Sequence, residues 1–324
     1  VWLAGDSLHC YLFLFFFFVV AFLFFFFKQK TAYEIPKRVW SSDVCSSDLV
    51  WAYLFLLPSL IGITVFYAVP YIMCVYNSLM SGGHFAGLDN YIAIFQNKAF
   101  LYALKNTMIF TVVAIPLLMI ISFLIAQFLN SFEKITSFFR SAYLMPIVIP
   151  AASLIYIWQM LFNDYGVINN ILNSLGFDTV HFFSSGFSMV MIILIYIWKN
   201  CGFCVILFTA GLANLPKSVH ESAYLEGASS FRTTVKITLP LITPTTFFVF
   251  LMAVINSFRM FRESFSLFGT YPNENVYFLQ NFINNNYNNF NYSQLSSSAI
   301  VMSIIFIGIM LAFFMYERKS DYLE

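Results

Sequence analysis

The sequence predicts an all-α polytopic membrane protein with six membrane-spanning helices. Of its 324 residues, 60% are hydrophobic and only 10% are charged, whereas soluble domains carry about 25% charged residues. Apolar runs of about 20 residues recur, and a helix of that length crosses a hydrocarbon core of about 30 Å. The net charge is +1 and no basic tail is present, so nucleic acid is not an expected partner.

Residues 1–49 are set apart from this plan. The apolar run Tyr11–Phe27 has ten phenylalanines among seventeen residues, and Ala21 is its one small residue, so another helix could not approach closely. No lysine or arginine precedes the run, as a signal peptide would require. The segment that follows resembles translated sequencing-adapter read-through, a non-native artefact; a genuine extra anchor helix is the alternative. Authentic sequence is expected to begin near Val50, with the membrane domain at 50–324.

Six apolar segments follow, each long enough for a membrane-spanning helix. The first contains Pro58 and Pro70, and the third contains Pro146 and Pro150. Proline is tolerated in such helices where neighbouring helices satisfy the freed carbonyl groups, so these spans are expected to be broken or kinked and closely packed. In chain order, the spans are expected at about 51–79, 104–129, 141–161, 187–212, 241–265 and 297–316.

Charges in the connecting segments predict the orientation. Segments 130–140 and 213–240 carry lysine and arginine, as does the C-terminal tail, whereas 162–186 and 269–296 contain neither residue. The positive-inside rule therefore places the basic segments and both termini in the cytoplasm. The asparagine-rich stretch 281–291 is expected to face outward.

The cytoplasmic segment 213–240 has a pattern that a simple connection does not need. It contains Glu221-Ser222-Ala223-Tyr224-Leu225-Glu226-Gly227-Ala228, and then Ile237-Thr238-Leu239-Pro240. Polar helix-forming residues thus alternate with small ones between two long apolar spans.

Backbone chemistry predicts that this segment is a rigid helix–turn–helix. Pro216 fits a helix start, where its missing N–H costs nothing, and Gly227 permits the sharp turn before a second helix. The small side chains of Ala223 and Ala228 would let a partner surface approach, and Pro240 stiffens the entry into the fifth span. A docking site for a soluble cytoplasmic partner is expected; an ordinary amphipathic loop is the alternative.

This pattern resembles the EAA loop of ATP-binding-cassette (ABC) importer permeases. Ser222 stands where a second alanine is usual and Glu226 where aspartate is usual, and both changes keep the size class or the charge. A wider resemblance, to the MalF-like carbohydrate (sugar) permease family, covers most of 50–324. It is carried by Leu56-Leu57-Pro58, Phe85–Tyr91, Phe100, Asn106-Thr107 and Ala210-Gly211-Leu212 before Pro216-Lys217.

The resemblance implies the type I ABC importer permease fold in a bacterial cytoplasmic membrane, and a binding-protein-dependent importer of sugar. An ATP-binding subunit dimer would grip 213–240, the candidate coupling loop. A second permease subunit would complete a heterodimer, and an extracellular solute-binding protein would deliver the ligand. The residues that the resemblance assigns to ATPase coupling are Glu221, Ala223, Glu226, Gly227, Ala228, Ile237, Leu239 and Pro240.

The chain itself is expected to be no enzyme and to need no cofactor. It contains no G-x-x-x-x-G-K-[ST] phosphate loop, so energy for transport would come from the separate ATPase. A permease for glycerol phosphate or amino acids is the alternative. A secondary transporter is less well supported, because it would show carboxylates within several spans and inverted repeats.

Ionisable residues inside the spans are the candidates for a substrate pathway. Lys199 lies about 18 Å into the fourth span, where a charge costs at least ~2.5–3.5 kcal/mol and must face protein or a watery cavity. In the fifth span, Asn256, Arg259 and Glu263 are expected on one helical face. The alternatives are an interhelical ion pair for Lys199 and a surface Arg259–Glu263 pair. The aromatic residues expected at similar depth are Trp158, Tyr196 and Trp198.

No metal site is predicted. The four histidines are scattered and the five cysteines form no regular framework. Cys201 and Cys204 have C-x-x-C spacing but lie within a span, where small residues packing between helices are the better explanation.

Overall fold

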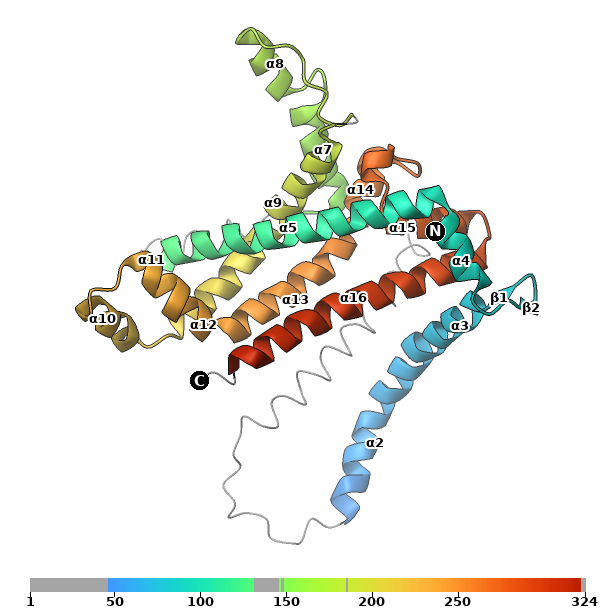
Figure 1. Cartoon of the computed structure of the whole chain (residues 1–324), viewed down its shortest axis with the longest axis horizontal. Helices are drawn as coiled ribbons and strands as arrows, with labels where there is room; N and C mark the ends of the chain where they lie inside the picture. Colours follow the sequence, from blue (N-terminus) through green and yellow to red (C-terminus); the bar gives the residue numbers. More distant parts are fainter. Residues whose placement is uncertain (1–45, 131–145, 147–148, 185, 322–324) are drawn as a thin grey trace. The chain divides into compact units, whose positions relative to one another are not determined.

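The computed structural model describes residues 46–130, 146, 149–184 and 186–321 (Figure 1). Apart from one short hairpin, its regular elements are helices, which confirms the all-α prediction. The segments long and apolar enough to cross a membrane correspond to the expected first, second, fourth, fifth and sixth spans. In the described part of the chain these are Leu56–Ser78, Lys98–Asn130, Ser188–Ala213, Thr243–Phe268 and Tyr292–Met315.

Two expectations concern residues that the structure does not describe. Residues 1–45, which include the phenylalanine-rich run, lie outside the described part, and α2 begins at Ser46, slightly before the expected start. Most of the first half of the expected third span, 141–161, also lies outside it. The second half is helix α7, Ala151–Phe162.

The chain divides into two compact units. Unit 1 comprises residues up to Ile94 together with 286–303, and unit 2 comprises 95–285 and 304–324. Three helices have residues in both units, and their bounds are α4 (Asp89–Gln96), α15 (Leu279–Asn288) and α16 (Tyr292–Asp321).

Unit 1 begins with a long helix whose geometry depends on proline. Helix α2 (Ser46–Ile63) continues through Pro58 into a π-helical turn, η1 (Thr64–Ala68), and then α3 (Val69–Ser78). Pro70 lies in the first turn of α3; it has no N–H, and its ring crowds the carbonyl four residues earlier, so the preceding turn widens. The span is therefore continuous with one widened turn, and the expected break does not occur.

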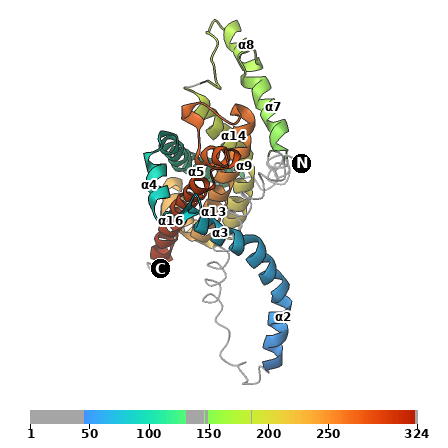
Figure 2. The same cartoon turned by 90° about the vertical axis from the view of Figure 1, so that its right-hand side faces the viewer.

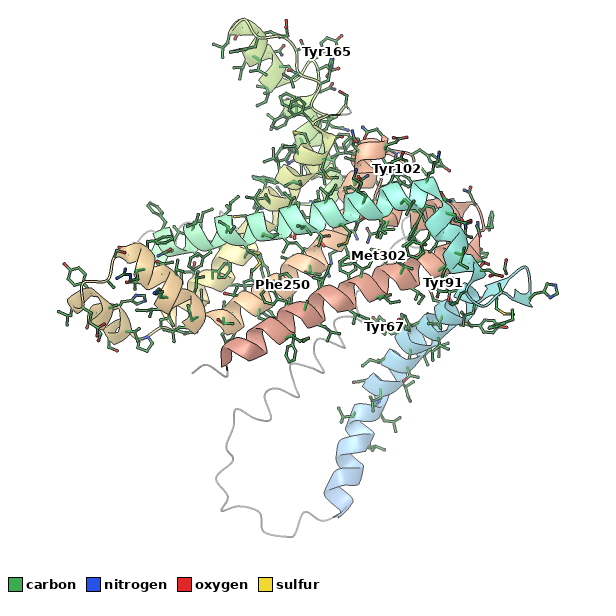
Figure 3. All side chains as sticks on the ribbon, in the orientation of Figure 1. Tyr67, Tyr91, Tyr102, Tyr165, Phe250 and Met302 are labelled. Carbon is green, nitrogen blue, oxygen red and sulfur yellow. The ribbon has the colours of Figure 1, made fainter. Side chains whose placement is uncertain are left out.

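A polar cluster closes the C-terminal end of α3. It adjoins an antiparallel hairpin of β1 and β2, Met80–Ser81 and His84–Phe85. The buried Asn90 donates from Nδ2 to the carbonyl oxygens of Ser78 (2.9 Å) and Met80 (3.0 Å). The hydroxyl of Tyr91, labelled in Figure 3, lies 2.7 Å from that of Ser78. These contacts satisfy carbonyl groups that a helix end leaves open, which gives Asn90 and Tyr91 a structural role.

Unit 2 is built on three long helices that lie side by side, as Figures 1 and 2 both show. Their facing side chains are apolar and buried, among them Leu118, Ile195 and Val254. In lipid, such helices associate through close packing and interhelical hydrogen bonds rather than through the hydrophobic effect. The three are α5 (Lys98–Asn130), α9 (Ser188–Ala213) and α13 (Thr243–Arg259).

The fifth span has an unexpected turn. Helix α13 ends at Arg259, and α14 (Phe261–Phe268) begins after Met260. Within unit 2, the end of α16 packs on α13, where Phe250 and Phe313 stack with their ring centroids 4.0 Å apart.

Asn106 and Thr107 of α5 hold the segment that follows α14. This segment contains the short helix η3 (Glu274–Val276). Asn106 donates from Nδ2 to the carbonyl oxygens of Glu274 (2.6 Å) and Tyr277 (3.0 Å). The Thr107 hydroxyl accepts the N–H of Leu279 at 3.0 Å. A motif found in the sequence by resemblance alone thus holds a long connection to α5.

The segment between α7 and α9 folds around one buried asparagine on α8 (Val167–Ser174). Asn169 donates from Nδ2 to the carbonyl oxygens of Asn163 (3.0 Å) and Val180 (2.9 Å), and its Oδ1 accepts the Val180 N–H at 2.9 Å. Nearby, Tyr165 is 91% exposed and points away from the three long helices of unit 2 (Figure 3). One side chain therefore closes this connection.

Replacing Asn169 with alanine should loosen the connection between α7 and α9. The change removes three hydrogen bonds and leaves partly buried backbone groups without these partners, a loss of about 1–3 kcal/mol. Limited proteolysis of the full chain should then cut 163–187 about tenfold faster. The control is Asn170→Ala, because that neighbour is exposed; equal cutting of both variants would contradict the assigned role.

Candidate functional site

The candidate coupling loop is a helix–turn–helix at one end of unit 2 (Figure 1). Pro216 is the N-cap of its first helix, as expected. The C-terminal end of that helix is closed by two bonds of 3.0 Å, from the Ala228 N–H to the Ala223 carbonyl and from the Gly227 N–H to the Tyr224 carbonyl. The elements of the loop are α10 (Lys217–Leu225), α11 (Ser230–Thr233), η2 (Thr234–Thr238) and α12 (Leu239–Leu241).

Gly227 has the backbone conformation that this closure requires. Its φ is +77°, in the left-handed region that glycine enters without a steric penalty. The two bonds form a Schellman motif, which satisfies the last carbonyl groups of a helix. The turn that the sequence predicts at Gly227 is therefore confirmed.

The second half of the loop begins with a cap and a widened turn. The Ser229 hydroxyl accepts the Arg232 N–H at 3.4 Å and starts α11. The π-helical turn η2 ends two residues before Pro240, just as η1 ends two residues before Pro70. The same cause applies, since a proline has no N–H for the ladder and crowds the turn before it.

Three large apolar side chains of the loop are almost fully exposed. Tyr224, Leu225 and Phe231 are 81%, 85% and 79% exposed. Sequence reasoning did not single them out, although large apolar residues in a polar loop were an available signal. Exposed aromatic side chains on a rigid element are typical of protein interfaces.

The residues assigned to ATPase coupling differ in exposure. Ala223 is buried and packs inside the loop. Its small side chain therefore does not allow the close approach of a partner that was expected there. The other members form two groups. Glu221, Glu226, Gly227 and Pro240 are exposed, and Ala228, Ile237 and Leu239 are half-buried.

Lys199 of α9 and Glu263 of α14 form an ion pair. Glu263 is almost fully buried and Lys199 is half-buried. Interhelical pairing, one of the alternatives for Lys199, is therefore present, and it replaces the Arg259–Glu263 pair that the helical spacing favoured. In the described chain, Glu263 Oε2 and the neighbouring Ser264 hydroxyl are buried without a hydrogen-bond partner.

The expected polar face of the fifth span is not continuous. Asn256 is half-buried, Arg259 is exposed and Glu263 is buried. Arg259 is the last residue of α13 and Glu263 lies in the first turn of α14, where it pairs with Lys199 of α9.

The aromatic residues near Lys199 have different roles. Trp158 and Trp198 make an edge contact with ring centroids 6.0 Å apart. Tyr196 is fully buried, and its hydroxyl donates to the Ala253 carbonyl at 2.6 Å. Tyr196 therefore joins α9 to α13, whereas Trp158 also stacks on Phe162, with ring centroids 5.1 Å apart.

The cysteines within α9 take part in helix packing. Cys201 and Cys204 are free thiols, and the Ser122 hydroxyl of α5 lies 3.5 Å from the Cys201 sulfur and donates to it. Among the residues that the structure describes, histidine, cysteine, aspartate and glutamate form no group of three able to hold a metal ion.

Comparisons with known proteins agree with this geometry. Residues 86–319 match a family described as "Binding-protein-dependent transport system inner membrane component". The chain is 32% identical over 251 residues to the arabinooligosaccharides transport system permease protein AraP of Bacillus subtilis (strain 168), covering 74% of this chain and 80% of that protein. It is 29% identical over 257 residues to the sulfoquinovosyl glycerol transport system permease protein SmoG of Agrobacterium fabrum (strain C58 / ATCC 33970), covering 76% and 83%.

The fold also matches a solved structure. A chain of the bacterial alginate ABC transporter, in complex with an alginate pentasaccharide-bound periplasmic protein, superposes with a TM-score of 0.72 at 22% identity. The match covers 83% of this chain and 95% of that chain. At this identity the likeness concerns the fold alone.

Proposed function

Because the chain belongs to the family of binding-protein-dependent transport system inner membrane components, we propose that it is the permease subunit of an ATP-driven sugar importer. It is a multi-pass protein of the bacterial cytoplasmic membrane. Relatives named for the transport of arabinooligosaccharides and of sulfoquinovosyl glycerol support a carbohydrate as the solute. A permease for glycerol phosphate or amino acids is the second candidate.

The observation that carries the proposal is the exposed apolar surface of the candidate coupling loop. Tyr224, Leu225 and Phe231 project from an element already held by its own caps. A preformed element loses little conformational entropy on binding. Burying each side chain in a partner would contribute about 1.5–3 kcal/mol. An ATP-binding subunit on the cytoplasmic side is the proposed partner, one copy of a dimer.

Two further partners follow from the same proposal. A second permease subunit would pair with this chain as a heterodimer, and an extracellular solute-binding protein would deliver the sugar. The alginate transporter, which was solved with its periplasmic protein, supports the latter.

The proposed pathway residues are Lys199, Asn256, Arg259 and Glu263. The ion pair of Lys199 with Glu263 leaves one buried carboxylate oxygen without a hydrogen-bond partner among the described residues, and such an oxygen is a hydrogen-bond acceptor. The neighbouring Trp158–Trp198 contact offers aromatic faces, on which a sugar ring could stack.

The docking proposal is tested with the variant Tyr224→Ser/Phe231→Ser. The chain is co-expressed with a candidate ATP-binding subunit and a second permease subunit, and the complex is purified in detergent. The variant should weaken association of the ATP-binding subunit by about 100- to 1000-fold, because two large apolar contacts are lost. The control Ile171→Ser removes an exposed apolar side chain from α8, outside the loop.

Unchanged association of the Tyr224→Ser/Phe231→Ser variant would overturn the proposed docking surface. Substrate class is tested separately, by titrating the cognate solute-binding protein with neutral oligosaccharides, glycerol phosphate and amino acids. Saturable binding of a sugar alone supports the proposed function, and binding of an amino acid alone replaces it.

A further inference from the structure

The two ends of the candidate coupling loop are held together by a close helix approach. A Cβ added to Gly211, in the last turn of α9, would lie 2.7 Å from the Thr245 Oγ1 in the first turn of α13. Side chains do not approach that closely, so the absence of a side chain at Gly211 lets the two helices touch here. Helices α9 and α13, which lead into and out of the loop, are therefore packed against each other where they join it.

A second contact joins the middle of the loop to a third helix. Gln127, in the last turn of α5, donates from Nε2 to the Thr234 Oγ1 at 2.6 Å. Thr234 is the first residue of η2, the turn widened ahead of Pro240. The two residues are 107 positions apart in the sequence, and both lie in unit 2.

We infer that the Gln127–Thr234 hydrogen bond makes the last turn of α5 follow the candidate coupling loop, so that this end of α5 is displaced by the ATPase together with the adjoining ends of α9 and α13. This inference rests on the proposed function. A loop attached only at its ends would pass force directly to α9 and α13. Helix α5 already packs along α9, and the bond at Thr234 adds a direct link from the loop to the last turn of α5. Gln127 is thus a positioning residue that acts through Thr234 and touches neither substrate nor nucleotide.

The test compares two threonines that stand side by side. Thr234→Val keeps the side-chain shape and removes the acceptor of Gln127. Thr233→Val is the matched control, because the Thr233 hydroxyl donates within the loop, to the Ser229 carbonyl at 3.2 Å. Hydrogen–deuterium exchange is measured on the assembled importer with and without Mg-ATP, following peptides from 217–239 and 122–130.

In the unaltered chain, Mg-ATP should change exchange in the loop and at the end of α5 together. In Thr234→Val the loop response should persist and the response of the last turn of α5, in peptides from 122–130, should be lost. Without nucleotide, exchange at 230–238 should rise about three- to tenfold, as expected for one hydrogen bond. Gln127→Leu should reproduce this result, and the double variant should add little to either single change.

An α5 response that survives in Thr234→Val, or that is lost equally in Thr233→Val, overturns the inference alone. A loop that fails to respond to Mg-ATP in the unaltered complex overturns the proposed docking and this inference with it. The two failures are therefore distinguishable in one experiment.

Discussion

Replacing Gly227 with valine is expected to abolish binding of the ATP-binding subunit, and ATP-driven uptake with it. The φ of +77° at this position is strained for a β-branched residue by about 1–3 kcal/mol. The Schellman closure would be lost, and α10 would end in a different geometry. Tyr224 and Leu225 project from the last turn of α10, so their side chains would no longer be in the positions proposed to contact the ATP-binding subunit.

The control for this prediction is Gly227→Asn, because asparagine tolerates the left-handed region better than other side chains. A Cβ at Gly227 would meet nothing within 4 Å, so the difference between the variants reports backbone conformation rather than crowding. Co-purification of the ATP-binding subunit and uptake into proteoliposomes are the measurements. Equal loss in the asparagine and valine variants would refute the backbone explanation.

Breaking the ion pair between α9 and α14 is expected to have the second large effect. Glu263→Leu leaves the Lys199 ammonium half-buried without its partner, which should cost about 3–5 kcal/mol of stability. Lys199→Met/Glu263→Leu removes both charges and should recover most of that loss. Thermal unfolding of the purified chain in detergent measures both, and a double variant as unstable as Glu263→Leu would contradict the pairing.

The same variants separate a structural role from a role in transport. If the double variant is stable and assembled but uptake falls, the pair contributes to the substrate pathway. Unchanged uptake, together with unchanged stimulation of ATP hydrolysis by substrate, would remove Lys199 and Glu263 from the proposed pathway. Arg259→Gln, at an exposed position on α13, is then the variant that tests the remaining charge.

The elements that local chemistry controls could be predicted from the sequence. Apolar length placed five of the spans to within about six residues at each end. Proline and glycine preferences placed the start of α10 directly after Pro216 and its end just before Gly227. These preferences are local, so no knowledge of the tertiary fold was needed.

Contacts between distant helices could not be predicted in this way. Helical spacing favoured Arg259 as the partner of Glu263, but the partner is Lys199, 64 residues away. Arg259 is exposed whereas Glu263 is buried against α9, and nothing in the local composition indicates this difference. The small size of Ala223 suggested an accessible contact, whereas the Schellman turn folds that residue inward.

The resemblance to sugar permeases drew attention to some residues but did not indicate their role. Asn90, Asn106 and Thr107 belong to segments that resemble those of sugar permeases, and each makes hydrogen bonds that close a helix end or hold a connection. Their geometry identifies them as parts of the scaffold. Gln127 and Thr234 carried no sequence signal, because a hydrogen bond across 107 positions leaves no local pattern.

The widened turn before Pro240 determines how the fifth span is oriented about its own axis. An α-helix rotates by about 100° per residue, and a π-helical turn accommodates one residue more than an α-helical turn. Converting η2 to regular α-helix would therefore rotate the side chains of α13 by about that angle relative to α11, which leads directly into η2. Through this turn, Pro240 influences which face of α13 packs against α9 and which face remains open to lipid or to a partner.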